Sequence, residues 1–236
     1  MGSIMHDIPI VRIEHADLQF VPRPWQFAIQ RRSEIDAYFA TLQRDKPHMW
    51  NGQVLILYEA AIEGTTLRGA YLETDFASFI AWRDWGWPDP TMRNCFGQGA
   101  LRAADGAFVL GVMSSHTANA GMIYFPSGTP DRNDVVGTSV DLAGSVLREL
   151  EEETGLTAAD VTAEPNWYAA LAGPRLAMLK VLHANLPAVE LRARILAHMA
   201  AETRPELADV RIARGPADID PMMPGFIPAF LTHMWR

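Results

Sequence analysis

Cysteine is almost absent from this sequence: Cys95 is the only one among 236 residues. A single thiol can form neither an internal disulfide nor a cysteine-based zinc site, which favours a reducing compartment. The chain also lacks any run near the ~18 uninterrupted apolar residues of a membrane span. Its first ten residues, MGSIMHDIPI, lack the basic and apolar regions of a secretory signal. We therefore expect a cytoplasmic protein that makes no contact with a membrane.

Positive charge is scarce as well. The chain has 20 Lys and Arg against 28 Asp and Glu, which gives a formal net charge of −8. A general nucleic-acid interface needs a basic face, so we expect no nucleic-acid partner. The composition, 49% hydrophobic and 20% charged, is that of a globular protein long enough for one large domain or two small ones. The oligomeric state stays open, with a homodimer as one alternative.

The pattern of residues predicts a boundary near residue 90, where the segment WPDP interrupts the chain. Residues 1–90 are predicted to form a small α+β unit. Its strands are expected within 8–13 and on both sides of a turn at Glu63-Gly64. One helix is expected in RRSEIDAYFATLQRDKP with Ser33 as its cap, and another in DFASFIAWRDWG with Thr74 or Asp75 as its cap.

Residues 91–236 are predicted to form the larger domain. An alternating pattern around Asp105-Gly106 indicates a hairpin. It is followed by a strand that stops at Pro126, a helix over 141–154, further strands and two more helices. The helix over 141–154 has Asp141 as a candidate cap and ends at Gly155. Because strands and helices are mixed along the chain, we expect an α/β or α+β fold, with a mixed sheet sandwiched between helices.

The helix predicted over 141–154 carries an unusual concentration of acid. At 100° per residue, its apolar side chains fall on one arc and three carboxylates fall on another, mostly opposite arc. Glu151 points elsewhere. The alternative interpretation is a solvated helix face, which is what a charge run usually indicates. If the apolar side is buried, however, the acid face is fixed in place and can meet a hard cation such as Mg²⁺. The three carboxylates are those of Glu149, Glu152 and Glu153.

The segment RELEEETGL, residues 148–156, resembles the second half of the Nudix box, G-x5-E-x7-R-E-U-x-E-E-x-G-U, where U is aliphatic. All seven specified positions of that half are met, by Arg148, Glu149, Leu150, Glu152, Glu153, Gly155 and Leu156.

The first half of the box departs from the pattern, because the expected Glu falls on Val140 and the expected Gly on Asp134. The segment FPSG, residues 125–128, looks like the strand end of the family but stands six residues too early. We interpret this as an insertion within residues 129–139, which we expect to be a mobile polar loop. Gly128 is then the box glycine, and Ser127 takes the place of the glycine whose backbone carbonyl helps to bind metal in the family.

The resemblance implies a hydrolase that cleaves a nucleoside diphosphate linked to another group, X. The metal would be Mg²⁺, with Mn²⁺ as the alternative, held by Glu149, Glu152, Glu153 and the carbonyl of Ser127. Such an ion neutralises the diphosphate and lowers the pKa of a bound water. Glu149 is the first candidate for the general base and Arg148 belongs to the catalytic motif. Three acids on later segments are further candidates for the base: Glu164, Glu190 and Glu202.

The identity of X is open. A strand pair followed by a helix and a DG hairpin is similar to enzymes that cleave UDP-glucose and UDP-galactose, so a nucleotide sugar is the first hypothesis. The spacing in AGMIYFPSGTPDRND resembles the enzymes that cleave coenzyme A, which is the alternative. Arg175 is a candidate for a phosphate contact, His116 for a substrate contact, and Trp85 for a stacking surface. Packing between the two units is the alternative for Trp85.

A second class of function is a Nudix-fold protein that has lost catalysis and binds a ligand or a protein. A binding relic would tend to lose its acids, whereas all three are present here, which favours an enzyme.

Overall fold

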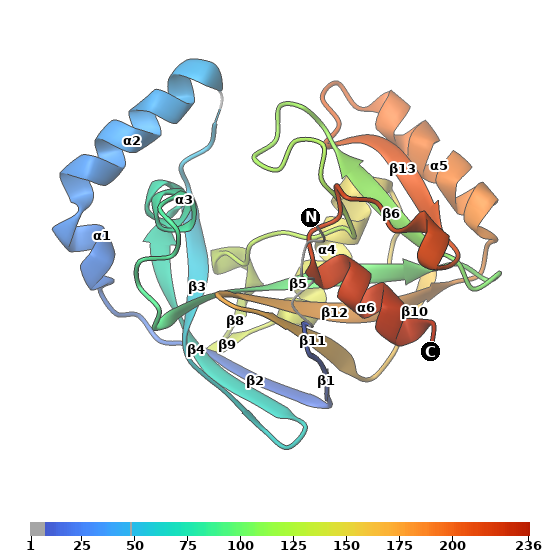
Figure 1. The fold of residues 1–236 in the computed structure, drawn as a ribbon, viewed down its shortest axis with the longest axis horizontal. Coiled ribbons are helices and arrows are strands. Elements are labelled where there is room, and N and C mark those ends of the chain that lie inside the picture. Colours follow the sequence, from blue (N-terminus) through green and yellow to red (C-terminus); the bar gives the residue numbers. More distant parts are fainter. Residues whose placement is uncertain (1–7, 48) are drawn as a thin grey trace, which may run out of the picture.

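The computed structural model describes residues 8–47 and 49–236, within which thirteen strands join into one sheet. None of the helices in these residues is long and apolar enough to cross a membrane. Figure 1 shows the arrangement. The elements before residue 90 are β1 (Ile10–Ile13), β2 (His15–Phe20), α1 (Gln26–Gln30), α2 (Arg32–Asp45), β3 (Gln53–Glu63), β4 (Thr66–Asp75) and α3 (Phe76–Asp84).

The elements after residue 90 include the remaining strands of the sheet and the helices α4, α5 and α6. They are β5 (Met92–Arg102), β6 (Phe108–Met113), β7 (Ile123–Tyr124), η1 (Arg132–Asp134), β8 (Val135–Val136), β9 (Ser139–Val140), α4 (Leu142–Thr154), β10 (Val161–Ala163), β11 (Trp167–Ala172), β12 (Arg175–Ala184), α5 (Ala188–Ala201), β13 (Leu207–Ala213), η2 (Pro216–Asp218) and α6 (Phe226–Met234).

The sheet is mixed, as the sequence predicted. Its longest path is β1-β11-β12-β5-β3-β4-β2-β9-β8, with β6 paired to β5, and β7 and β13 paired to β6. The β5–β12 pair is parallel and the β3–β5 pair is antiparallel. Strands from both sides of residue 90 are thus hydrogen-bonded to one another. The division of the chain at residue 90 into two units stays a prediction.

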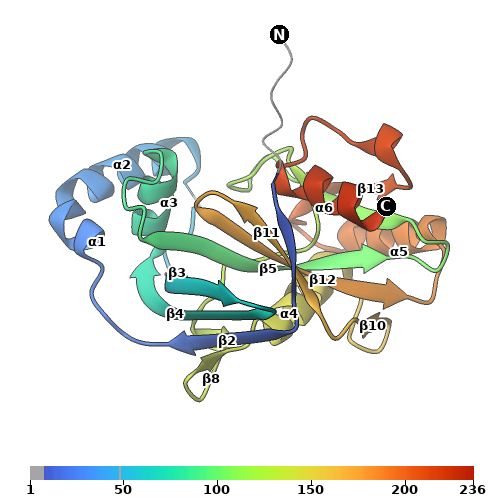
Figure 2. The ribbon, with the colours of Figure 1, turned by 60° about the horizontal axis from the view of Figure 1, so that its bottom comes forward.

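Strand β5 lies between two helices. Its successive side chains point to opposite faces of the sheet, so each face packs against a different helix. On one face Gly97 lets α4 approach closely: a Cβ at this position would lie 2.6 Å from Cγ2 of Val146. On the other face the ring of Phe96 lies 5.7 Å from that of Phe226 on α6. Helices therefore cover both faces of the sheet, α4 on one side and α6 on the other (Figures 1 and 2).

Of the two helix caps predicted within residues 1–90, one agrees with the structure and the other does not. Asp75 caps α3 by accepting a hydrogen bond of 2.7 Å from the N–H of Ser78. Ser33 does not cap α2. Helix α1 ends at Arg31, whose N–H donates to the carbonyl of Phe27, and α2 begins directly after it. Ser33 therefore lies inside the first turn of α2 rather than before it. The short helix α1, which the sequence pattern did not indicate, shifts the start of α2 to Arg32.

Residues 129–139 contain more regular structure than the predicted polar loop. Asp131 accepts a hydrogen bond of 2.7 Å from the N–H of Asn133 and opens η1. Strands β8 and β9 then pair as a small hairpin, and β9 also pairs with β2 at Gln19. Local side-chain hydrogen bonds and two-residue strands leave no periodic pattern in a sequence, so these elements could not be predicted. The mobility of residues 129–139 without ligand stays a prediction.

Candidate functional site

Helix α4, with the bounds Leu142–Thr154, holds the acidic motif in place. Asp141 caps it, accepting from the N–H groups of Ala143 and Gly144 at 3.1 and 3.0 Å, as the sequence suggested. Gly155 ends it with a φ of 68°, a left-handed conformation that glycine adopts without strain. A Cβ at Gly155 would also lie 2.6 Å from Nδ1 of His198. Glycine is needed here for both conformation and space.

Two of the three predicted carboxylates meet the turn that follows β7. Glu153 is 4% exposed and accepts a hydrogen bond of 3.0 Å from the N–H of Ser127. Glu149 lies against Gly128, where a Cβ would be only 2.3 Å from Oε1 of the carboxylate. Any larger residue at position 128 would displace Glu149. The segment FPSG thus sits directly on the acid face of the helix, which agrees with the assignment of Gly128 as the box glycine.

The remaining acids of the run face outward. The side chain of Glu152 is 60% exposed, compared with 14% for Glu149. Glu151 is exposed and makes no ion pair with the residues that the structure describes. The helical wheel therefore separated Glu151 from its neighbours correctly. It did not separate Glu152, which shares the acid face but stands at its open edge.

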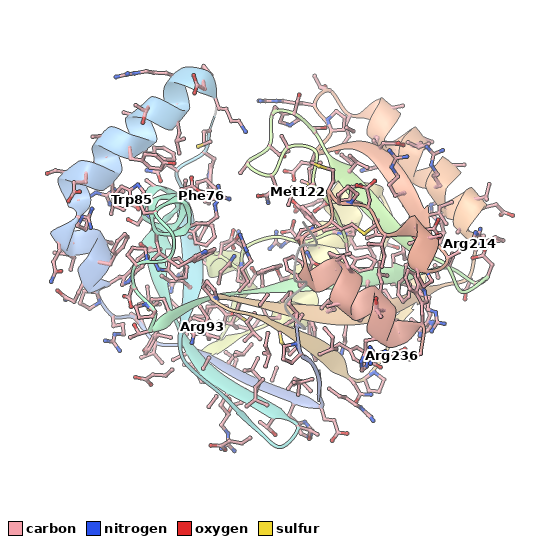
Figure 3. All side chains as sticks on the ribbon, viewed as in Figure 1. Phe76, Trp85, Arg93, Met122, Arg214 and Arg236 are labelled. Carbon is pink, nitrogen blue, oxygen red and sulfur yellow. The ribbon has the colours of Figure 1, made fainter. Side chains whose placement is uncertain are left out.

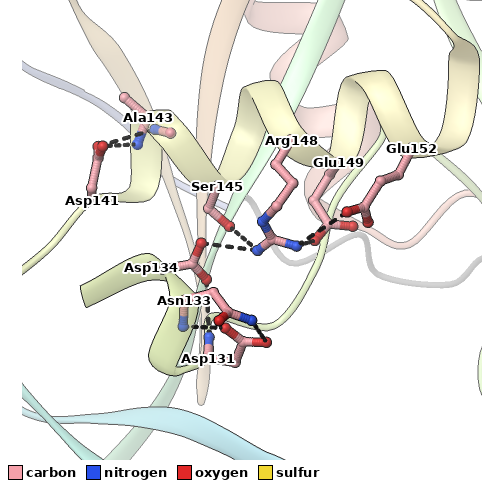
Figure 4. Close-up of polar contacts among 10 residues, drawn as sticks. Asp131, Asn133, Asp134, Asp141, Ala143, Ser145, Arg148, Glu149 and Glu152 are labelled. Carbon is pink, nitrogen blue, oxygen red and sulfur yellow. Dashed lines mark hydrogen bonds and ion pairs between the residues drawn. The ribbon is translucent and has the colours of Figure 1, made fainter. Parts of the chain in front are cut away.

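Arg148 ties the acid face to the loop of residues 129–139 (Figure 4). Its guanidinium lies 2.9 Å from a carboxylate oxygen of Asp134 and 2.9 Å from Oε1 of Glu149, with Glu152 at 3.8 Å. The side chain of Asp134 is only 2% exposed. The loop therefore places a buried carboxylate, that of Asp134, against Arg148. We had not singled out Asp134, because it stands at a different spacing from Arg148.

Negative charge at the site is crowded. The pKa of Glu149 is raised to about 7, chiefly by burial; the carboxylates of Glu152 and Glu206 contribute to the rise, and Arg148 opposes it. Burial also raises the pKa of Glu153 well above its usual value, with the carboxylates of Glu149 and Glu206 adding to the effect. When carboxylates share a site in this way, binding of a cation or a proton relieves the repulsion among them.

Glu206, in the segment between α5 and β13, is the acid that sequence reasoning missed at this site. Its backbone carbonyl accepts a hydrogen bond of 2.8 Å from the N–H of Ser114. Burial raises the pKa of Glu206, as does Glu152, and His116 opposes the shift. Its side chain retains exposed surface, so this burial is partial. No local motif marks Glu206, because only the fold brings it near α4.

The donor set suits a hard cation, although the described residues contain no group of three or more His, Cys, Asp and Glu side chains that is ready to hold a metal. The available ligands are oxygens with an excess of negative charge, which is the chemistry that Mg²⁺ prefers. The carboxylates are close enough to raise one another's pKa without forming a closed ligand shell. The predicted ligands Glu149, Glu152, Glu153 and the carbonyl of Ser127 stay a prediction.

A cavity of about 680 Å³ opens beside the acid site. Ser127 and Gly128 line it at one end, and Arg175 lines it as well. Helix α3 forms one wall and the segment between β6 and β7 forms another; Phe76 and Met122 mark these two walls in Figure 3. A volume of this size is typical of a pocket for a small molecule.

The three predicted substrate residues have different places. Arg175 lines the cavity, and His116 lies near enough to Glu206 to lower the pKa of that carboxyl. Trp85 does not line it. Its ring lies on the side of α3 that faces α2, 5.7 Å from the ring of Tyr38 (Figure 3). This contact lies within residues 1–90, so it is not the packing between the two predicted units that was the alternative for Trp85.

Three other acids had been considered as bases. Glu164 lies 2.9 Å from Nε2 of His183, and Glu202 is 3.7 Å from Nε2 of His198. Glu190 lies in the first turn of α5. Glu206 raises the pKa of both Glu149 and Glu153, and Glu202 in turn raises the pKa of Glu206.

No family model matches the sequence, and no curated protein matches it. Among solved structures, the chain is similar to the Nudix hydrolase RenU from M. smegmatis, with 18% identity over 59% of this chain and 81% of that chain, and a TM-score of 0.38. A MutT protein from Methanosarcina mazei Go1 gives 17% identity, coverage of 61% and 94%, and a TM-score of 0.39.

A third similar structure is a bifunctional NMN adenylyltransferase/ADP-ribose pyrophosphatase from Francisella tularensis, in complex with AMP and a Mn ion. It shares 14% identity over 66% of this chain and 45% of that chain, with a TM-score of 0.43. Each of these three TM-scores is below 0.5, so the functional argument rests on this chain's own side chains.

Proposed function

We propose that this protein is a Nudix-type, Mg²⁺-dependent diphosphatase that cleaves a nucleoside diphosphate linked to another moiety. The observation that supports it best is the contact between the FPSG turn and the acid face of α4. Gly128 leaves space for Glu149, and the N–H of Ser127 donates to Glu153. Two sequence segments that the resemblance joins into one motif are therefore in contact in space.

The residues of the site divide the chemical work in this proposal. Glu149, Glu152, Glu153 and the carbonyl of Ser127 would hold the cation. When bound, Mg²⁺ would neutralise the charge of the diphosphate, which otherwise repels a nucleophile. Arg148 holds Glu149 in place while Asp134 holds Arg148, so we assign Arg148 a positioning part. Glu149, whose pKa is raised to about 7, would accept the proton of the attacking water, since a general base works best with a pKa near the working pH. Glu206, whose pKa is also raised, is the second candidate for the base.

The moiety X is first expected to be a sugar, with a coenzyme A-type substrate as the alternative. The third alternative is a protein that binds such a ligand without cleaving it. Two observations favour catalysis. The carboxylates of Glu149, Glu152 and Glu153 are all present, and the loop places the carboxylate of Asp134 against Arg148.

A substrate panel tests the proposal. Nucleotide sugars, coenzyme A, dinucleotides and nucleoside triphosphates are incubated with Mg²⁺ or Mn²⁺, and phosphate-containing products are separated and identified. We expect cleavage within the diphosphate of at least one compound, and no cleavage by Glu149→Gln. Absence of cleavage across the panel, in protein that binds a member of it, would favour the non-catalytic alternative.

A further inference from the structure

One face of β5 lines the cavity with alternating residues: Asn94, Phe96 and Gln98. Gln98 is 1% exposed, and its Nε2 donates to the hydroxyl of Ser127 at 3.1 Å. Its other amide atom, Oε1, has no hydrogen-bond partner among the described residues. The buried Oδ1 of Asn94 lacks one in the same part of the chain. Buried acceptors without partners cost free energy, so their presence on a cavity wall indicates a ligand that supplies donors.

Two arginines stand near the Asn94 end of this face. Arg175 on β12 is in register with Asn94 on β5. Its guanidinium lies over the ring of Trp87, 5.1 Å from the ring centre, and within the described residues it forms no ion pair. Arg83 also lines the cavity and has Asp84 as its ion-pair partner at 2.7 Å.

The two guanidinium groups interact unfavourably. Partial burial lowers the pKa of Arg175, and the positive charge of Arg83 lowers it further. Arg175 keeps an exposed side chain, so this loss of hydration is incomplete and places the group at the rim of the cavity. Arg83 has a carboxylate partner, whereas Arg175 has none among the described residues. In a chain with a net charge of −8, such a guanidinium beside a cavity suits an anion, which the planar fork of an arginine binds through two parallel hydrogen bonds.

The two ends of the cavity are separated along β5. Gln98 contacts Ser127 at the acid site, whereas Asn94 lies beside Arg175. Four residues of a strand span about 13 Å. A diphosphate at the acid site would therefore leave the arginines to bind a different part of the same molecule.

We infer that the cavity binds the part of the substrate beyond the diphosphate, and that this part carries hydrogen-bond donors and a second anionic group, a phosphate monoester or a carboxylate. The inference rests on the proposed function for the position of the diphosphate. Asn94 and Gln98 accept from the donors, and Arg175, with Arg83, binds the anion. The aromatic wall of Phe76 and Phe96 packs against the remainder.

Matched ligand pairs test the anion. Coenzyme A is compared with 3′-dephospho-coenzyme A, which lacks only the phosphate monoester, and UDP-glucuronate with UDP-glucose, which lacks only the carboxylate. Binding is measured by calorimetry in EDTA, so that no turnover is required. In one of the two pairs, we expect the member with the extra phosphate monoester or carboxylate to bind at least ~10-fold more tightly, the scale of one good charged contact. The pair that shows the difference identifies the anion.

Variants locate the contact. Arg175→Gln should abolish the difference between the two members and change the affinity of the member without the second anion by less than about threefold. Arg93→Gln is the matched control: it makes the same change of charge one residue before Asn94, on the opposite face of β5, and does not line the cavity. The control should keep the full difference. Equal binding of both members of both pairs, or a difference that survives both Arg175→Gln and Arg83→Gln, would overturn the inference.

A second pair of variants tests the donors. Gln98→Leu removes the free acceptor and the contact with Ser127, whereas Ser127→Ala removes only that contact. Gln98→Leu should weaken both members of a pair at least ~10-fold more than Ser127→Ala does. Equal effects would show that Gln98 only supports the turn. If charge-selective binding is found and no compound is cleaved with Mg²⁺, the proposed function fails. If cleavage occurs without charge selectivity, the inference alone fails.

Discussion

The two ends of the cavity carry opposite charge for different structural reasons. The acid end is built by one helix and the turn that touches it, so its carboxylates come from a continuous stretch of nine residues plus Asp134 and Glu206. The arginine end is built by α3 and the start of β12, which are about 90 residues apart in sequence. We propose that the first end binds a cation and the second an anion. Local spacing therefore reveals one end of the site, and only sheet register reveals the other.

Removal of divalent metal should have the largest effect and should act at the acid end alone. With EDTA, hydrolysis should fall to background, and Mg²⁺ should restore it, because the crowded carboxylates otherwise repel a diphosphate. Binding of the preferred ligand to the arginine end should persist in EDTA with reduced affinity. Full activity in metal-free protein would contradict the proposed role of the acid end.

Single acids on α4 should differ sharply. Glu153→Gln and Glu152→Gln should each lower turnover by at least ~10²-fold, the scale of a lost charged contact in the transition state. Glu151→Gln is the matched control, with the same change of charge on the same helix, and should alter turnover by less than about threefold. Steady-state kinetics at saturating Mg²⁺ measure this. A similar loss in all three variants would show that total charge matters rather than position.

Asp134→Asn should have an intermediate effect. It keeps the shape of the side chain but removes the charge that faces Arg148 at 2.9 Å. Arg148 is one-third exposed and retains Glu149, so we expect a loss of about 1–2 kcal/mol in the free energy of unfolding. Turnover should fall by about tenfold, since a misplaced positioning group weakens alignment.

Asp131→Asn is the control for Asp134, because Asp131 bonds only within the loop. Denaturant unfolding and kinetics should show little change in this variant. If both variants lose activity equally, loop structure rather than the Arg148 contact supports the site.

The smallest effect is a pH dependence of stability in metal-free protein. The pKa of Glu149 is raised from 4.5 to about 7, chiefly by burial. Between these values the folded protein holds a proton that the unfolded chain has released, so the free energy of unfolding should fall as the pH rises through this range. Thermal melts should show this slope, a smaller slope in Glu149→Gln and an unchanged one in Glu151→Gln. A slope of the opposite sign would exclude the raised pKa.

Much of the acid end could be predicted without a structure. Helix 141–154, its cap at Asp141, its end at Gly155 and the separate orientation of Glu151 all follow from residue spacing at 3.6 residues per turn. The motif predicted that Gly128 lies at the acid face of this helix. The exposure of Glu152 could not be predicted, because a helical wheel gives the face on which a residue lies but not how deeply it is buried.

The remaining features required tertiary structure. Asp134 could not be recognised, since its contact with Arg148 spans 14 residues and depends on the hydrogen-bonded turn of η1. Trp85 was a reasonable candidate for stacking, yet its environment is set by the packing of α2 on α3. Similarly, Ser33 looked like a cap until the preceding helix α1 placed it inside a turn.

The sequence by itself determined the helix that carries the acids and the glycine that ends it, Gly155, because these depend on neighbours within a few residues. The motif placed Gly128, and the alternation of strands and helices along the chain indicated a mixed sheet. Tertiary structure alone decided that Gln98 and Asn94 face a cavity, that Arg175 joins them from a distant strand, and that Glu206 approaches α4. Strand register brings together residues that share no sequence period, and burial then sets their charge and hydrogen-bonding demands.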